Sequence, residues 1–161
     1  MDIESFGRIL VCILFSFFQI TVESKCLKNC SFCSNEEIIC TAIGLIDVPM
    51  VSPFMIHFNI SHNEIQDLEQ KSFAHLPLLI DLDLSHNVVS IIPDRVFAGL
   101  GSLKRLYLNN NRIKTIEKYG FRNLHELKEL HLQSNRLVYF KTDYFQELFN
   151  LKNLVIFTGN N

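Results

Sequence analysis

The sequence predicts an α/β solenoid, a short curved right-handed coil with a parallel β-sheet on its concave face. Three observations support this prediction: a motif that recurs with a 24-residue period, an apolar frame inside each repeat, and a cysteine cluster ahead of the first repeat. The chain has 161 residues, which is the length of one domain. Its formal net charge of −2 gives no electrostatic reason to expect nucleic acid or an anionic membrane as a partner.

One asparagine marks each repeat. Asn63, Asn87, Asn111 and Asn135 follow one another at this constant spacing, and apolar residues recur at fixed offsets around each of them. A single repeat cannot bury its apolar face, whereas stacked neighbours share a continuous core. We therefore expect each repeat to begin with a short strand whose alternate side chains point inward, followed by a turn and an irregular or short helical return.

The repeated asparagine and a repeated phenylalanine have separate structural tasks. The chain turns inward after each strand, so backbone groups lose their sheet partners. A buried amide can satisfy such groups in its own repeat and in the next one. The phenylalanines should form a second spine along the return side, each ring contributing roughly 1.5–3 kcal/mol. They are Phe73, Phe97, Phe121 and Phe145.

This pattern resembles the extracellular leucine-rich-repeat family with 24-residue repeats, the style seen in Toll-like receptors, Slit proteins and neuronal adhesion receptors. The resemblance covers residues 26–161 and implies a protein-binding module, a receptor or adhesion ectodomain with an extracellular protein ligand. The expected organisation is a cysteine-rich N-terminal cap over residues 25–53, four leucine-rich repeats over 54–150 and a partial fifth repeat over 151–161. Two alternatives are a structural matrix protein similar to small leucine-rich proteoglycans such as decorin, and a truncated isoform with no independent binding role.

Residues 1–24 are predicted to be a signal peptide. The segment from Ile9 to Ile20 is almost unbroken apolar sequence. It is too short to span a bilayer, which needs roughly 20 residues, but it fits the apolar region of a signal peptide. We therefore expect a secreted chain, or a cell-surface one if it is part of a longer membrane-anchored protein. The alternative is a buried apolar segment of the domain.

Four cysteines, Cys26, Cys30, Cys33 and Cys40, lie close together. An even set in an exported chain favours two disulfides. Zinc is the alternative, because Cys30 and Cys33 have the spacing of zinc ligands. In the caps of the family that the chain resembles, the first cysteine bonds the third and the second bonds the fourth. That resemblance implies the pairs Cys26–Cys33 and Cys30–Cys40, although the two middle cysteines are one residue further apart here than in the family.

The end of the sequence departs from the family pattern. Such proteins usually continue into a second cysteine-rich cap, whereas this sequence ends at Gly159-Asn160-Asn161. The strand expected within Leu151–Ile156 would then lie at an open edge, which invites pairing. The sequence predicts a truncated isoform, a fragment, or a protein whose uncapped end is covered by a partner or by a second copy in a dimer.

The outward-facing strand positions form three columns on the expected concave face, the usual binding face of such solenoids. The first column is His57, Asp81, Arg105, Glu129 and Asn153; the second is Asn59, Asp83, Tyr107, His131 and Val155; the third is Ser61, Ser85, Asn109, Gln133 and Phe157.

One hypothesis for this face is a protein-binding patch centred on Arg105, Tyr107, Glu129 and His131, because tyrosine and arginine are enriched at interface hot spots. The alternative is a solvated ladder in which Asp81, Arg105 and Glu129 satisfy one another. Asp83 belongs to the same candidate surface, which mixes both signs of charge.

Two N-glycosylation sequons occur, at Asn59-Ile60-Ser61 and Asn29-Cys30-Ser31. Asn59 should face outward from the first strand. A glycan there would shield the N-terminal part of the concave face and direct a ligand toward repeats three to five.

The sequence contains no motif for a catalytic, cofactor or metal site, so we predict a non-enzymatic protein without cofactor or metal. His62 and His86 occupy equivalent places in two repeats, where they could stack and bind a metal or sense pH. The alternative interpretation is a pair of exposed turn residues. No transmembrane span is expected, because no later stretch is long and apolar enough to cross a bilayer.

Overall fold

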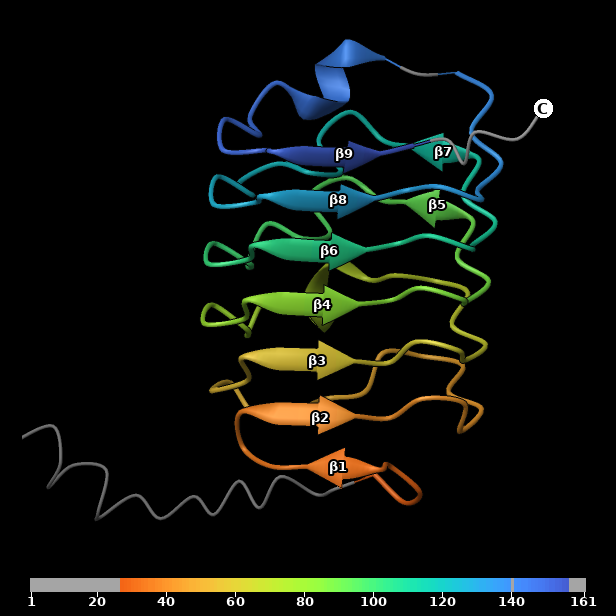
Figure 1. The fold of residues 1–161 in the computed structure, drawn as a ribbon, viewed down its shortest axis with the longest axis vertical. Coiled ribbons are helices and arrows are strands. Elements are labelled where there is room, and N and C mark those ends of the chain that lie inside the picture. The colour runs from red at the N-terminus through yellow and green to blue at the C-terminus, as the bar shows by residue number, and fades with distance from the viewer. Residues whose placement is uncertain (1–26, 140, 157–161) are drawn as a thin grey trace, which may run out of the picture.

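The computed structural model describes residues 27–139 and 141–156, which form a stack of coils (Figure 1). The predicted signal peptide, residues 1–24, lies outside the described residues. We name the first four coils after their repeated asparagines, so that the first coil contains Asn63, the second Asn87, the third Asn111 and the fourth Asn135. Within the described residues, no helix is long and apolar enough to cross a membrane.

One sheet runs along the whole stack, as Figure 1 shows. The strand order is β1-β2-β3-β4-β6-β8-β9, and every pair is parallel except β1 with β2. The strands are β1 (Phe32–Cys33), β2 (Glu37–Ile39), β3 (His57–Asn59), β4 (Asp81–Asp83), β6 (Arg105–Tyr107), β8 (Glu129–His131) and β9 (Asn153–Val155). The parallel sheet predicted from the repeat is confirmed, and β1 and β2 extend it into the cysteine-rich region.

The return side of the coils contains very little regular structure. A second sheet pairs β5 (Ile91–Ile92) with β7 (Thr115–Ile116) in parallel. Two short 3₁₀ helices, η1 (Gln70–Ser72) and η2 (Thr142–Phe145), lie in the returns of the first and fourth coils. In the described part of the chain the helical half of the α/β solenoid is therefore reduced to 3₁₀ helices and turns.

The apolar frame of the repeats forms one continuous core. The inward residues of the strands, such as Leu82 and Leu106, are completely buried. Along the return side the phenylalanine rings follow one another at centroid distances of 5.5, 6.2 and 5.8 Å. Rings at these separations are in contact, so the second spine links four coils.

The repeated asparagines bind the backbone of two coils. Asn87 accepts a hydrogen bond at Oδ1 from the Ile65 N–H and donates from Nδ2 to the carbonyls of Ile60, Leu84 and Ser85. The bonds to Leu84 and Ser85 lie within the coil of Asn87, as expected, but Ile65 and Ile60 belong to the preceding coil, so the expectation that the amide also serves the next repeat is wrong. The side chain leans toward the preceding coil, where the turn leaves one N–H and one carbonyl without sheet partners.

The cysteine-rich segment ahead of the first coil contains a disulfide between Cys30 and Cys40, with Cα atoms 4.2 Å apart. Cys33 is also disulfide-bonded. This segment pairs with the first coil, because β2 lies against β3 and the Cys40 N–H donates to the Asn59 carbonyl at 2.8 Å. The predicted partner of Cys33, Cys26, lies outside the described residues.

Candidate functional site

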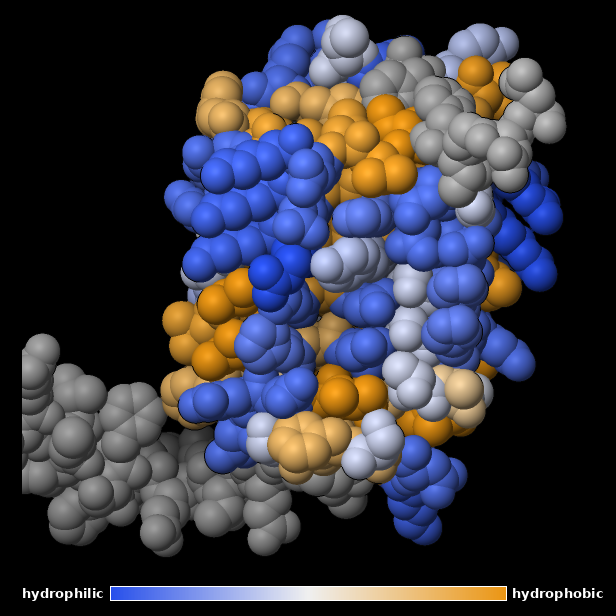
Figure 2. Space-filling model, in the orientation of Figure 1, coloured by the Kyte–Doolittle hydropathy of each residue, from blue (hydrophilic) through white to orange (hydrophobic). Residues whose placement is uncertain are grey.

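The strand registers align the outward-facing side chains into columns across the sheet. His57 is paired with Asp81, Asp81 with Arg105, and Arg105 with Glu129. The neighbouring column aligns Asn59, Asp83, Tyr107, His131 and Val155. Figure 2 shows that this concave face is mostly polar over β4, β6 and β8 and becomes apolar around β9. The face therefore has a polar middle and an apolar C-terminal end.

Asp81 is the centre of the first column. Its carboxylate accepts from Arg105 Nη2 at 2.6 Å and also contacts Arg105 Nε, so the two side chains form a bidentate ion pair. The oxygen that accepts from Nη2, Asp81 Oδ2, also lies 2.6 Å from His57 Nδ1. The Asp81 side chain is 17% exposed, whereas its two partners are about half exposed. This arrangement fixes three side chains from three adjacent strands.

The ion pairs differ from the ladder expected from the sequence. Arg105 pairs with Asp81, and Glu129 makes no ion pair with Arg105. Glu129 Oε2 instead lies 3.9 Å from His131 Nε2. The hydrogen bond to Asp81 raises the pKa of the Arg105 guanidinium above its ordinary value. Arginine has five N–H donors and this pair uses two, so the others stay available to a ligand.

Tyr107 and His131 form a second cluster beside the first. Their ring centroids are 4.8 Å apart and the ring planes are inclined by 35°. Burial, with the negative charge of Glu129 next in importance, raises the pKa of the Tyr107 phenol. The phenol therefore stays protonated at neutral pH and can donate a hydrogen bond. The structure thus brings Arg105, Tyr107, Glu129 and His131 onto two adjacent strands.

The face is hollowed at its N-terminal half, over β2, β3, β4 and β6. The cavity has a volume of about 270 Å³, and its lining includes Glu37, Asn59, Asp83, Arg105 and Tyr107. The repeat pattern does not identify the β2 residues, because the cysteine-rich segment lies outside the 24-residue period. Arg105 and Tyr107 form one wall of the cavity, which places the hollow and the candidate patch side by side.

Asn59 lies within this hollow. Its Oδ1 accepts hydrogen bonds from the N–H and the hydroxyl of Ser61, at 3.0 and 2.8 Å. A glycan on Asn59 would therefore start inside the hollow. Asn29, the other sequon asparagine, is exposed in a turn with φ of 73°.

The third column is less accessible than expected from the sequence. Ser61 and Ser85 are only 4% and 6% exposed, so neither can take part in a binding surface. The chain turns inward directly after each strand, and this turn carries the serines into the interior. Asn109 and Gln133 are half-buried, while Phe157 lies outside the described residues.

His62 and His86 stack on adjacent coils, with ring centroids 4.1 Å apart and planes 9° from parallel. Both are exposed turn residues with positive φ, and His86 Nε2 lies 3.2 Å from Asn110 Nδ2. Within residues 27–139 and 141–156, no three histidine, cysteine or acidic side chains are grouped to hold a metal ion. The two histidines are therefore both stacked and exposed in the turns.

The stacked parallel strands, the asparagine ladder and the phenylalanine spine together define a repeat solenoid. A family model described as leucine rich repeat matches residues 57–113 and 101–161. The chain belongs to the leucine-rich-repeat family.

Comparison with solved structures agrees with this family. The chain is similar to the protein in the structure titled "Crystal structure of TLR13-ssRNA13 complex", with 31% identity, 61% of this chain covered and a TM-score of 0.59. This chain spans 14% of the length of that protein. No curated protein matches the sequence. The family and this Toll-like receptor neighbour point to a non-enzymatic binding fold.

Proposed function

We propose that this chain is an extracellular protein-binding module, of the receptor or adhesion ectodomain type, whose concave face recognises a protein ligand. The binding surface is centred on Arg105, Tyr107, Glu129 and His131, with Asp81 and Asp83 beside them. The localisation is secreted, or at the cell surface within a longer membrane-anchored protein. The family and the similarity to a Toll-like receptor support this class of function.

The observation that carries the proposal is the placement of Arg105 and Tyr107. Both side chains project from β6, both line the hollow, and each is held by a neighbour on an adjacent strand. Side chains that are fixed before binding lose less conformational entropy when a ligand arrives. Tyrosine and arginine held in this way are the residue types most often found as interface hot spots.

The mixed charge of the face favours a protein ligand over a polyanion. Asp81, Asp83 and Glu129 lie in the same two columns as Arg105, so a phosphate backbone would meet carboxylates next to the single guanidinium. Binding to nucleic acid depends on an excess of cations along the backbone. We therefore propose no nucleic-acid ligand for this face, although the similar solved structure is titled as a complex with single-stranded RNA.

The test of the proposal is a double substitution, Arg105→Ala with Tyr107→Ala. Labelled secreted chain is titrated onto cultured cells and onto purified extracellular proteins, collagen included, and saturable binding is measured. We expect the double substitution to weaken such binding by about 100-fold or more, since two hot spots each contribute about 2 kcal/mol. The thermal unfolding midpoint should change little, because both side chains lie on the surface of the sheet.

The matched control is Arg112→Ala with Tyr139→Ala, which removes the same residue types from exposed positions outside the two columns. The control should bind like the wild type. Unchanged affinity in the Arg105 and Tyr107 double variant would show that the site is elsewhere. Saturable binding to collagen alone would favour the matrix-protein alternative.

The sequon at Asn59 gives a second prediction. Chain secreted from mammalian cells should lose mass on treatment with an N-glycosidase, and the loss should be smaller in the Asn59→Gln variant. Because Asn59 and Arg105 line the same hollow, a glycan on Asn59 would lie beside the binding surface and leave its His131 end as the most accessible part. Binding that depends on Arg105 should therefore persist in Asn59→Gln. The same mass loss in wild type and variant would mean that Asn59 is unmodified; the Asn29→Gln variant then serves to test the second sequon.

The apolar surface around β9 fits the predicted contact with a partner or a second copy. β9 is paired with β8 on one side, and Leu154 is 38% exposed although its equivalents Leu106 and Leu130 are fully buried. Such a contact stays a prediction, as does the assignment of residues 25–53 as the cap and 151–161 as a partial fifth repeat.

A further inference from the structure

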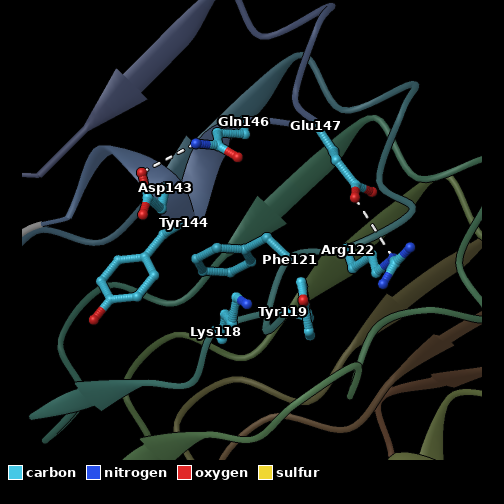
Figure 3. Close-up of a pocket in the computed structure, with 8 residues that line it drawn as sticks. All are labelled: Lys118, Tyr119, Phe121, Arg122, Asp143, Tyr144, Gln146 and Glu147. Carbon is cyan, nitrogen blue, oxygen red and sulfur yellow. Dashed lines mark hydrogen bonds and ion pairs between the residues drawn. The ribbon is translucent and has the colours of Figure 1, made fainter.

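A small pocket lies on the return side of the solenoid, away from the candidate binding face. It has a volume of about 80 Å³ and lies between the third and fourth coils. The third coil contributes Lys118, Tyr119, Phe121 and Arg122, and the fourth contributes Asp143, Tyr144, Gln146 and Glu147 (Figure 3). Both signs of charge and three aromatic rings therefore line one cavity.

Positive charge gathers on the third-coil side, around Tyr119. Lys118 Nζ and the guanidinium carbon of Arg122 each lie 4.9 Å from the centroid of the Tyr119 ring, and that of Arg95 lies at 5.5 Å. The hydrogen bond from Lys118 lowers the pKa of the Tyr119 phenol, and the charges of Lys118, Arg122 and Arg95 act in the same direction. An anionic group beside this phenol would be stabilised by the same charges.

The backbone around Tyr119 is fixed by the neighbouring coil. The Tyr119 N–H donates to Asp94 Oδ1 at 3.1 Å, and the Tyr119 carbonyl accepts from the Arg95 N–H at 3.0 Å. Glu117 Oε2 accepts from the Asp94 N–H at 2.7 Å. These bonds hold the cationic side of the pocket in place before any ligand binds.

Two charges of the pocket have no ion-pair partner of their own. Glu147 lies 3.5 Å from Arg122, but among residues 27–139 and 141–156 no carboxylate is within ion-pair distance of Lys118 and no cation is within that distance of Asp143. Asp143 accepts a hydrogen bond from the neutral Gln146 amide at 3.0 Å. Lys118 and Asp143 belong to different coils. The hydrogen bond to Tyr119 is the main cause that raises the Lys118 pKa, and the negative charge of Asp143 makes a smaller contribution in the same direction.

Figure 3 shows how these groups are arranged. Lys118 and Tyr119 lie on one side of the view, Asp143 and Gln146 on the other, and the Phe121 ring lies between them. Phe121 is buried and forms an apolar floor. A polyanion such as a sulfated glycan would be repelled by Asp143 and Glu147, and a simple cation by Lys118 and Arg122. A ligand with one charge of each sign satisfies both sides.

We propose that this pocket binds a zwitterionic ligand of the size of one amino acid, with its anionic group on Lys118 and the Tyr119 phenol and its cationic group on Asp143. The short apolar part between the two charges packs on the Phe121 and Tyr144 rings. This site is separate from the concave face and does not depend on the function proposed for that face.

The test uses a series of ω-amino acids from glycine to 6-aminohexanoate, which differ in the distance between their charges. Binding to the full chain is followed by NMR, through the ring resonances of the tyrosines. We expect saturable shifts, with one chain length binding at least tenfold more tightly than acetate or methylammonium alone. Acetate binding as tightly as every zwitterion would overturn the proposal, because it would define a site for anions only. The absence of saturation for the whole series would also overturn it.

The variants test which side chains form the site. Lys118→Asp and Asp143→Lys should each weaken binding of the best ligand at least tenfold, and the two changes together should restore it, because the exchanged pair still presents one charge of each sign. A merely structural role would not produce this rescue. Lys114→Asp is the control, since Lys114 is exposed on the same coil outside the pocket. Single variants that bind like the wild type, or a double variant that stays as weak as the singles, would contradict the assignment.

An independent readout comes from the titration of Tyr119. In the Lys118→Met variant the phenol loses its hydrogen bond and the nearest positive charge, so its pKa should rise toward the ordinary value. In the wild type, saturation with the best zwitterion should also raise the Tyr119 pKa, because a carboxylate then lies beside the phenol. A Tyr119 pKa that does not respond to saturating ligand would place that ligand elsewhere.

Discussion

The second and fourth coils contain the same frame of residues but differ in how well that frame is buried. Asn87 and Phe97 of the second coil are 5% and 0% exposed. Their equivalents Asn135 and Phe145 in the fourth coil are half-buried. The second coil has a complete coil on each side, whereas the fourth is followed in the described residues only by β9 and the segment leading to it. A repeat therefore supplies apolar surface, and its neighbours decide how much of that surface leaves water.

The largest expected difference between these coils concerns the phenylalanine spine. Phe97→Ala should destabilise the fold by about 3–5 kcal/mol, because it empties a fully buried site between two other rings. Phe145→Ala should cost about half as much, since its site is already partly open to water. The free energy of unfolding of each variant, measured in urea, tests this difference. Equal losses would show that the fourth coil is covered in solution by something outside the described residues.

The asparagine ladder should show the same contrast with a smaller amplitude. Asn87→Ala leaves the Ile65 N–H and three carbonyls without their side-chain partner, which should cost about 3 kcal/mol in a buried site. Asn135 accepts from the Ile113 N–H and donates to the carbonyls of Leu108 and Leu132. Water can replace these bonds at the half-buried position, so Asn135→Ala should cost about 1 kcal/mol. Hydrogen exchange measures the effect locally, at the Ile65 amide in Asn87→Ala and at the Ile113 amide in Asn135→Ala. A larger increase over the wild-type exchange rate at Ile113 than at Ile65 would reverse the expected order.

The smallest effect concerns how closely the first two coils approach each other. A Cβ added at Gly99 would lie 2.6 Å from the Ala74 Cα, and one added at Gly101 would have no neighbour within 4 Å. Gly99→Ala should therefore destabilise by about 1–3 kcal/mol, because backbone of the adjacent coil must move. Gly101→Ala should change stability by less than about 0.5 kcal/mol. Thermal unfolding of the two variants side by side tests this, and two identical midpoints would mean that the spacing between the coils is adaptable.

Much of the fold could be predicted because the repeat encodes it directly. The 24-residue period of the asparagines identifies equivalent positions, and the apolar frame identifies which of them face inward. Leu82 and Leu106 are buried for this reason, and the strand register that aligns Asp81 with Arg105 follows from the same period. Periodicity carries this information because stacked coils place equivalent residues next to one another.

The candidate face was less predictable. Its columns follow from the strand register, but the choice of Asp81 as the partner of Arg105, the contact of Asp81 with His57 and the burial of Ser61 do not. A charged side chain in a column has a neighbour on each side, and sequence spacing does not distinguish the two. The pocket at Lys118 and Asp143 could not be anticipated either, because it depends on how the returns of two coils lie against each other.

The sequence by itself determined that this protein is a stack of coils with an inner asparagine ladder and a phenylalanine spine, because hydrophobic burial follows the period of the chain. The tertiary structure alone decided which coil each asparagine binds, which charges pair on the concave face and how far the terminal coils are buried. Those outcomes depend on side-chain rotamers and on the offset between neighbouring coils, and a one-dimensional pattern does not specify either of them.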